Sequence, residues 1–97
     1  MKISKYVRIE SNARFNKLAR ARLKMQNKCK GHLYLVCTSY SPHLLFEIIR
    51  SQDVTARHRD CYLVAVTDSK QSALFCVREL INELYNLKTI SYEMIKT

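Results

Sequence analysis

The sequence predicts a small α/β domain, and three observations lead to this expectation. Residues 33–38 (LYLVCT) and 61–67 (CYLVAVT) are continuous apolar runs of strand length, the pattern of central strands covered on both faces. Segments with helical spacing of apolar residues lie before and after these strands. The chain has one Gly and one Pro among 97 residues, which excludes a disordered or linker-rich protein. Its length fits one domain, residues 1–97, with the central strands flanked by helices.

The first two elements are expected in the N-terminal segment, residues 1–30. Residues 3–9 alternate weakly between apolar and polar side chains, which is typical of a short or edge strand. Ser11 or Asn12 can cap a helix over residues 12–28, which contains mostly good helix formers. At 100° per residue this helix has an apolar arc and a cationic back: Phe15, Leu18, Ala19, Leu23 and Met25 against Lys17, Arg20, Lys24 and Lys28. Arg14 lies at the margin, and Arg22 falls inside the apolar arc.

A second helix is expected between the two central strands. Ser41 followed by Pro42 is a helix start signal, with Ser as the cap and Pro at the first helical position. The segment then continues with apolar residues at helical spacing, namely Leu44, Leu45, Ile48 and Ile49.

The last two elements are expected after the second central strand. Asp68, with Gln71 three residues later, forms a loose capping box. It begins a helix over about 70–86 that is apolar over much of its circumference and should pack deeply. Residues 89–95 alternate apolar and polar side chains, which indicates a final, half-exposed strand. The predicted order is β-α-β-α-β-α-β, arranged in two or three layers.

The sequence also indicates where the protein works. No apolar run approaches the roughly 18 residues that a membrane span needs, and the N-terminus lacks the apolar core of a signal peptide. We therefore expect a soluble, cytoplasmic protein without a membrane partner. In that compartment the four cysteines are expected to be reduced: Cys29, Cys37, Cys61 and Cys76.

The charge is distributed unevenly along the chain. The formal charge is +9, from 17 Lys and Arg against 8 Asp and Glu. Residues 1–30 hold ten basic side chains and one acidic side chain, whereas residues 31–97 hold seven of each. The whole excess of positive charge therefore lies in the first third of the chain.

Such a basic segment favours nucleic-acid binding. Lys17, Arg20, Lys24 and Lys28 form a row about 16 Å long at about 1.5 Å per residue, and cations in a row can neutralise phosphates and release counterions. The row should contact the backbone rather than base edges, because no Asn or Gln pair accompanies it. The predicted binding residues are Arg14, Lys17, Arg20, Arg22, Lys24, Lys28 and Lys30.

Other partners remain open at this point. A cationic helix with a half-apolar face also suits an acidic groove, so the protein can instead be a regulator or inhibitor of an acidic protein, as compact proteins of mobile elements often are. A membrane surface fits less well, because the arc lacks Trp. The half-exposed strands at 3–9 and 89–95 leave room for edge pairing into a homodimer.

The sequence contains one candidate metal site. Cys29-x-x-His32 precedes the first central strand and His58-x-x-Cys61 precedes the second, which matches the ligand types and number of a structural zinc site. The four side chains would meet only if the two strands are adjacent and parallel. The alternative is a set of core-edge cysteines and surface histidines, so no cofactor is expected.

The sequence contains no strong signature of catalysis. One Gly cannot form a phosphate-binding loop, and no His-Glu-x-x-His helix or nucleophile elbow is present. We therefore expect no catalytic residues. Residues 31–85 nevertheless resemble the GIY-YIG nuclease superfamily in four short runs: GHLYLV at 31–36, EIIRS at 47–51, DVTAR at 53–57, and VTD at 66–68 leading to Ala73 and Leu74.

This resemblance implies specific roles. Tyr34 would match the tyrosine of the first motif and Arg57 the arginine of the following helix. The second motif departs from the family, since Glu47-Ile48-Ile49 stands where Tyr, an apolar residue and Gly are usual. The metal-binding Glu is also misplaced, with Phe75 or Val77 at the expected position and Glu79 as the nearest acid.

Two further expectations follow from the resemblance. It implies either a GIY-YIG-like nuclease that cleaves with a divalent metal ion, or an inactive relative, a nuclease-like fold that has lost cleavage and retains binding. It also implies an antiparallel pairing of the first two strands, which would separate the two Cys/His pairs and exclude the zinc site.

Overall fold

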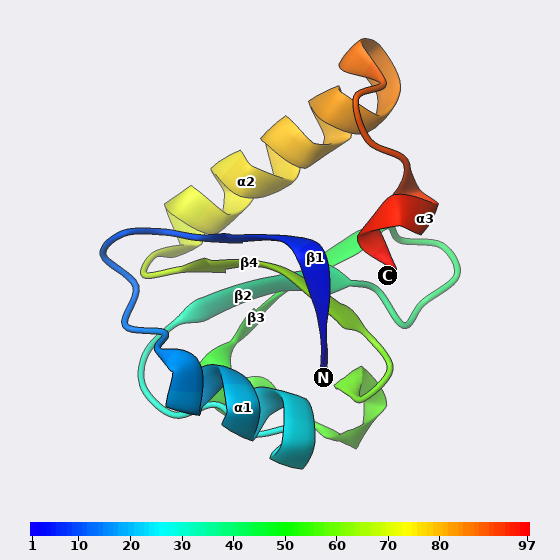
Figure 1. Cartoon of the computed structure of the whole chain (residues 1–97). Helices are drawn as coiled ribbons and strands as arrows, with labels where there is room; N and C mark the ends of the chain where they lie inside the picture. The colour runs from blue at the N-terminus through cyan, green and yellow to red at the C-terminus, as the bar shows by residue number, and fades with distance from the viewer.

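The computed structural model describes residues 1–97 and contains a mixed four-stranded sheet with helices on both faces (Figure 1). The strands are β1 (Lys2–Ile9), β2 (Tyr34–Thr38), β3 (Phe46–Arg50) and β4 (Tyr62–Thr67), in the spatial order β1-β4-β2-β3. β1 is parallel to β4, whereas β2 is antiparallel to both β3 and β4. The helices are α1 (Lys17–Gln26), α2 (Lys70–Asn82) and the short α3 (Tyr92–Ile95).

The α/β class and the two central strands are confirmed. β4 and β2 occupy the middle of the sheet, with α1 on one face and α2 and α3 on the other, which gives three layers (Figure 1). Successive residues of β2 alternate between two cores, as a pleated strand requires. Leu35 and Cys37 pack with Leu23 of α1, while Val36 packs with Leu80 of α2.

A bulge interrupts the pairing of β4 with β2. Val36 is opposite Ala65, but the next residue, Cys37, is opposite Leu63, so Val64 is the extra residue. Val64 and Ala65 both belong to the α2-side core, whereas Leu63 belongs to the α1-side core. One inserted residue therefore reverses the alternation of β4 at this point.

β1 is an edge strand, as the sequence predicts, and it is bent. Its partners change from Ile3 opposite Leu63 to Arg8 opposite Ala65, which leaves the residues between them outside regular pairing. Figure 1 shows the strand turning sharply. The backbone N–H of Lys5 donates instead to the carbonyl of Thr97 at 3.4 Å. The middle of β1 thus lies beside Thr97.

The prediction of a helix after Pro42 is wrong. This segment forms a turn followed by β3. The backbone N–H of Leu44 donates to the Ser41 carbonyl at 3.3 Å, so the Ser-Pro signal marks a turn, another position that these residues favour. The β-branched Ile48 and Ile49 then continue into a strand that pairs antiparallel with β2. The observed order is β-α-β-β-β-α-α instead of β-α-β-α-β-α-β.

The prediction of a strand over residues 89–95 is also wrong, because this segment contains the short helix α3. Ser91 caps α3, with its hydroxyl accepting from the backbone N–H of Met94 at 3.2 Å. Ile95 is fully buried in the α2-side core, although the alternation assigned the inward face to Ile90, Tyr92 and Met94. The second sheet edge is therefore β3.

The predictions of α1 and α2 are confirmed, but the N-terminal caps and the C-terminal ends of both helices differ from those predicted. α1 begins later than expected, because Asn16 rather than Ser11 or Asn12 is its cap, accepting from the Ala19 N–H at 2.8 Å. It ends where Asn27 adopts a left-handed backbone with φ of 55°. α2 is capped by Ser69 rather than Asp68 and continues into a π-helical turn, Glu83–Leu87.

α2 packs less deeply than its composition suggests. Ala73 and Leu80 are fully buried, but Leu74 is 53% exposed and Ile81 is 41% exposed. The helix thus covers the sheet with one stripe and leaves an apolar stripe outside. None of the helices has the length and apolar character needed to cross a membrane.

Candidate functional site

The predicted cationic face of α1 lies on the surface. Leu23 points into the core beneath the helix, and Lys17, Arg20 and Lys24 are exposed. The predicted apolar arc is partly wrong, because Leu18 is 66% exposed and Met25 is 83% exposed. Only a narrow side of this short helix contacts the sheet, so two of its large apolar residues have no core to enter.

The C-terminal end of α1 is anchored at a fixed place on the sheet. The α-amino group of Met1 donates to the Leu23 carbonyl at 3.0 Å and to Asn27 Oδ1 at 2.6 Å, at the C-terminal end of the helix. Asn27 Nδ2 donates to the Thr55 carbonyl at 2.8 Å. These bonds hold the segment after α1 beside the connection that follows β3.

The predicted binding residues lie in two groups on different sides of α1. Two adjoining hollows beside the helix, of about 490 and 250 Å³, share Arg22, Lys28 and Lys30 in their lining, and Arg14 lines the smaller one. Arg22 is half-buried, so it extends outward from beneath the helix rather than entering the core. At 100° per residue, Lys17, Arg20 and Lys24 fall on the other side of α1, and they line neither hollow.

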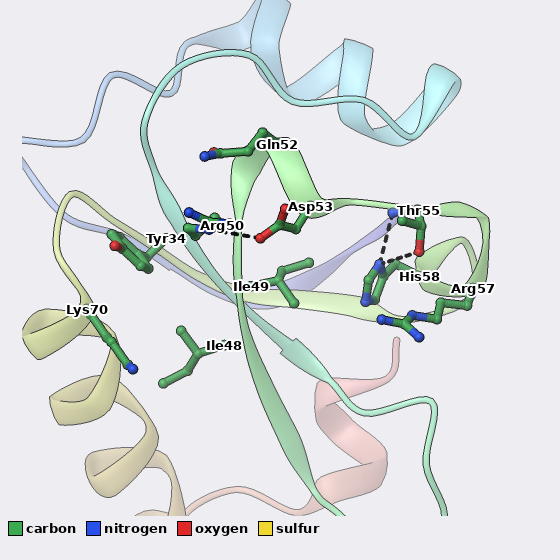
Figure 2. Close-up of a pocket in the computed structure, with 10 residues that line it drawn as sticks. All are labelled: Tyr34, Ile48, Ile49, Arg50, Gln52, Asp53, Thr55, Arg57, His58 and Lys70. Carbon is green, nitrogen blue, oxygen red and sulfur yellow. Dashed lines mark hydrogen bonds and ion pairs between the residues drawn. The ribbon is translucent and has the colours of Figure 1, made fainter.

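A larger hollow of about 600 Å³ lies at the exposed edge of the β2–β3 hairpin (Figure 2). The hairpin places Tyr34 opposite Arg50, and the antiparallel pairing of β2 with β4 brings the start of α2, with Lys70, to the same end of the sheet. We call this the central hollow. Its lining is Tyr34, Ile48, Ile49, Arg50, Gln52, Asp53, Thr55, Arg57, His58 and Lys70.

The central hollow is mainly cationic. Asp53 is its one acidic side chain, and Asp53 Oδ2 accepts from Arg50 Nε at 2.9 Å. This hydrogen bond raises the pKa of Arg50 above its already high value. The guanidinium of Arg57 lies 4.9 Å from the ring centre of Tyr40, which fixes its direction at the rim. Arg57 and Lys70 form no ion pair, so their charges are available to an anion.

His58 forms a buried wall of the central hollow. Its Nδ1 accepts from the Thr55 backbone N–H at 3.0 Å, whereas its buried Nε2 has no hydrogen-bond partner. Burial lowers the pKa of His58 below 6.5, the nearby carboxylate of Glu47 opposes this shift, and the charge of Arg57 adds to it. The ring is therefore neutral near pH 7.

The three hollows are neighbours on the surface of the protein. Gln52 lines both the central hollow and the larger hollow beside α1. Together they form one surface, which we call the cationic surface. Its charged members are Arg14, Arg22, Lys28, Lys30, Arg50, Arg57 and Lys70, with Asp53 as the single acid.

Three of the seven cations of this surface, Arg50, Arg57 and Lys70, are absent from the set of binding residues predicted from the sequence. Arg50 and Lys70 are separated by twenty residues and lie in a stretch of the chain with no net charge. The β2–β3 hairpin places Arg50 opposite Tyr34, and the pairing of β2 with β4 brings Lys70 to the same end, whereas the sequence pattern predicts a helix in place of β3. Arg57 is indicated only through the family resemblance.

The residues matched to the GIY-YIG family divide in the structure. Tyr34 and Arg57 line the same central hollow. Glu79 lies elsewhere, in a hollow beside β1 that includes Arg8 and Glu10. Val77 packs against the α2-side core, and Phe75 is exposed. The central hollow thus contains the matched tyrosine and arginine without a free carboxylate.

The four-residue zinc arrangement is not supported by the strand directions. β2 and β4 are antiparallel, so Cys29 and His32, before β2, lie at the opposite end of the strand pair from His58 and Cys61, before β4. All four cysteines are free thiols. Cys61 has Cys37 as its sulfur neighbour instead, with Glu47 close to both.

The chain was also compared with known proteins. No family model, curated protein or solved structure matches it.

Proposed function

We propose that the protein binds nucleic acid without cleaving it, and that the cationic surface contacts the phosphates. The observation that carries this proposal is the convergence of seven cations with one paired acid on three adjoining hollows. Several unpaired cations on a concave surface can neutralise consecutive phosphates and release their counterions. Tyr34, Gln52 and Thr55 add polar and aromatic groups that suit sugar and base contacts.

The two sides of α1 have different roles in this proposal. Arg22, Lys28 and Lys30 share a surface with the central hollow, whereas Lys17, Arg20 and Lys24 do not. The first group contacts phosphates directly. The second group acts at longer range, by attracting the polyanion, and its effect is more strongly screened by salt.

Two charge-reversal variants test this division. One carries Arg22→Glu, Lys28→Glu and Arg57→Glu, and the other carries Lys17→Glu, Arg20→Glu and Lys24→Glu, so their net charges are equal. Binding of fluorescent duplex DNA and single-stranded RNA is measured by anisotropy over a range of salt concentrations. The first variant should bind more weakly and show a shallower salt dependence on duplex DNA, by about 0.9 in slope for each phosphate that is no longer neutralised. The second should retain most of the slope.

A different outcome would contradict this division of roles between the two sides of α1. Equal decreases of affinity and slope in both variants would mean that net charge alone drives binding. Circular dichroism of both variants confirms that each is folded. The recovered DNA, incubated with Mg²⁺ or Mn²⁺, should be intact, with Tyr34→Phe as the comparison if cleavage occurs.

The absence of cleavage is part of the proposal, and the site chemistry supports it. Tyr34 and Arg57 favour an inactive relative of the GIY-YIG nucleases, because the central hollow holds both. A nuclease of this kind needs a carboxylate to hold its divalent metal ion. Here the one carboxylate of the hollow, Asp53, is engaged by Arg50.

A second function, docking on an acidic protein partner, is favoured by the outer side of α1. Leu18, Ala21 and Met25 are spaced three and four residues apart and are all exposed, and cations lie on both sides of them. An apolar ridge between cations fits a groove with an acidic rim. A pull-down that survives nuclease treatment distinguishes this function from nucleic-acid binding.

A further inference from the structure

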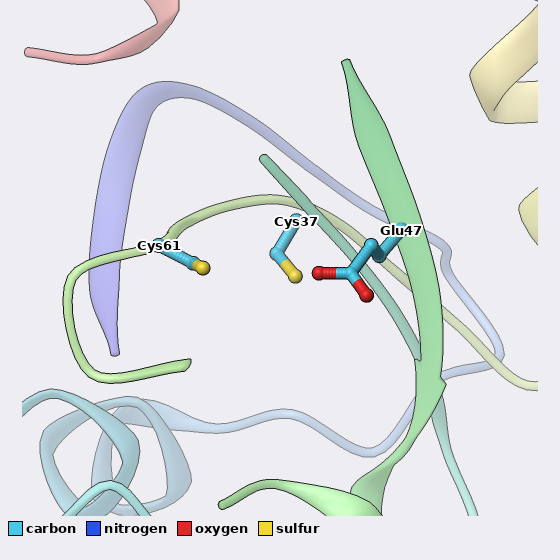
Figure 3. Close-up of side chains that lie close together, drawn as sticks. All are labelled: Cys37, Glu47 and Cys61. Atoms are coloured by element: carbon cyan, nitrogen blue, oxygen red, sulfur yellow. The ribbon is translucent and has the colours of Figure 1, made fainter. Parts of the chain in front are cut away.

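Three ligand-bearing side chains converge on the α1 face of the sheet, away from the lining of the cationic surface. Cys37 lies on β2, Glu47 on β3, and Cys61 just before β4. The two sulfur atoms and a carboxylate oxygen all lie within 4.8 Å of one another. Figure 3 shows the Cys37 sulfur between the other two groups, with all three side chains directed toward one another.

The fold positions these three residues through backbone pairing rather than through a flexible loop. Cys37 and Glu47 are directly opposite in the β2–β3 hairpin, so their side chains share one face. The bulge at Val64 places Leu63 opposite Cys37, which brings Cys61 to the same end of β2. The Tyr40 N–H donates to Glu47 Oε2 at 3.4 Å, and the Cys61 N–H donates to the His58 carbonyl at 3.1 Å.

The two thiols of this cluster are buried, and its carboxylate forms no ion pair. Cys37 is fully buried, Cys61 is nearly so, and neither of the two ion pairs of the protein involves Glu47. Burial raises the pKa of the Cys37 thiol, and the charges of Cys61 and Glu47 raise it further. Both thiols are therefore protonated in the metal-free protein, and a metal ion that binds them must displace their protons.

We propose that Cys37, Cys61 and Glu47 bind a zinc ion. Thiolate and carboxylate ligands from separate elements suit Zn²⁺, which takes sulfur, nitrogen and oxygen ligands in a tetrahedron. Two sulfur ligands disfavour Mg²⁺ and Ca²⁺, which prefer oxygen. A divalent ion would offset the negative charge of the two thiolates and the carboxylate. This proposal does not depend on nucleic-acid binding.

His58 lies near the cluster but is not part of it. It is 1% exposed, and its ring packs edge-on against Tyr40, whose backbone binds Glu47. The group of ligand atoms within 4.8 Å of one another does not include a ring nitrogen of His58. Its Nδ1 accepts from the Thr55 backbone N–H, so the ring proton is on Nε2. The fourth position of the zinc tetrahedron is therefore left to solvent. This set retains Cys61 of the sequence-predicted site and replaces Cys29, His32 and His58 with Cys37 and Glu47.

The zinc ion would join three parts of the chain that also form the central hollow. β2 carries Tyr34, β3 carries Arg50, and the segment after β3 carries Arg57. The ion would fix these parts relative to one another, on the face of the sheet opposite α2. Its predicted role is structural, so it should stabilise the fold.

The test uses the full chain, reduced and stripped of metal with a chelator. Zn²⁺ binding is measured by isothermal titration calorimetry, and Co²⁺ is added as a spectroscopic probe whose charge-transfer absorption reports thiolate ligands. The wild type should bind one Zn²⁺ per chain and show the thiolate–cobalt band. Cys37→Ser and Cys61→Ser should abolish stoichiometric binding, and Glu47→Gln should weaken it by roughly tenfold or more.

Matched controls come from the two other cysteines and from the displaced histidine. Cys29→Ser, Cys76→Ser and His32→Asn should bind Zn²⁺ like the wild type. Binding that is abolished in Cys29→Ser and His32→Asn, or retained in Cys37→Ser and Cys61→Ser, would overturn the proposal. So would a reduced, folded wild type that takes up no Zn²⁺.

A folding control covers the buried position of Cys37. Glu47 is partly exposed, so Glu47→Gln is expected to fold. Zn²⁺ should raise the midpoint of thermal unfolding of the wild type more than that of Glu47→Gln. Equal stabilisation of both proteins would count against Glu47 as a ligand. Circular dichroism of each variant without metal shows whether the absence of binding reflects an unfolded chain.

Discussion

Tyr92 connects the C-terminal helix to the sheet through one side chain. Its hydroxyl donates to the Leu45 carbonyl at 2.8 Å, and its ring packs edge-on against Phe46 with the ring centres 5.8 Å apart. Burial raises the pKa of Tyr92, so the phenol stays protonated and remains a donor. The sequence pattern instead predicts this residue on a strand, where it would have no such partner.

Removing that hydroxyl should destabilise the protein measurably. We expect Tyr92→Phe to lower the free energy of unfolding by about 1 kcal/mol, because one net hydrogen bond is removed while the ring packing remains. Tyr85→Phe is the matched control, since Tyr85 is exposed and its hydroxyl has no protein partner. Urea unfolding of both variants provides the measurement. Equal stability of the two would argue against the docking of α3 on β3.

At the scale of elements, α1 shows how local chemistry sets a boundary that composition does not. Ser11, Asn12 and Asn16 are all suitable caps by residue type. Residues 11–15 instead form a turn and an extended segment that places Phe15 in the core. Burial of that ring fixes the chain direction before the helix begins, and Asn16 becomes the cap.

The cap of α1 can be tested with two identical substitutions. Asn16→Ala should cost about 1 kcal/mol of unfolding free energy, because the Ala19 N–H loses its acceptor. Asn12→Ala, four residues earlier, should have little effect, since Asn12 lies outside the helix and is exposed. Chemical denaturation of both proteins decides between them. A larger destabilisation by Asn12→Ala would place the helix start where the sequence pattern alone predicts it.

The elements also show which parts of the fold can be predicted from sequence. β2, β4, α1 and α2 are predictable, because continuous apolar runs and helical spacing are strong local signals. Ile48 and Ile49 fit a helix as well as a strand by their spacing, and only pairing with β2 decides. For the same reason the cations of the N-terminal segment are predictable, whereas the approach of Arg50 to Lys70 is not, since it depends on the pairings of β2 with β3 and with β4, which have no clear sequence signal.

At the scale of the whole molecule, positive charge is concentrated and poorly compensated. Only two of the 17 Lys and Arg side chains form ion pairs, namely Arg8 with Glu83 and Arg50 with Asp53. The cationic surface brings further like charges together across the N-terminal segment and the hairpin. Folding therefore places cations near one another that are farther apart in the unfolded chain, and their mutual repulsion opposes folding.

Salt should relieve this repulsion. We expect the midpoint of thermal unfolding to rise by a few degrees between low ionic strength and about 0.15 M NaCl, where the Debye length is about 8 Å. A change of 1 kcal/mol corresponds to about 4–8 °C for a domain of this size. The variant with Arg22→Glu, Lys28→Glu and Arg57→Glu should show a smaller rise in differential scanning calorimetry. A midpoint that falls as NaCl is added would contradict this explanation.

The extra residue at Val64 has a further consequence for the phase of β4. Upstream of the bulge, Leu63 faces α1, and downstream Val66 faces α1 as well, although they are three positions apart. If β4 slipped by one residue to absorb the bulge, Cys61 and Leu63 would turn to the α2 face and leave Cys37. The bulge therefore fixes the register of β4, and the short distance between the sulfur atoms of Cys37 and Cys61 depends on it.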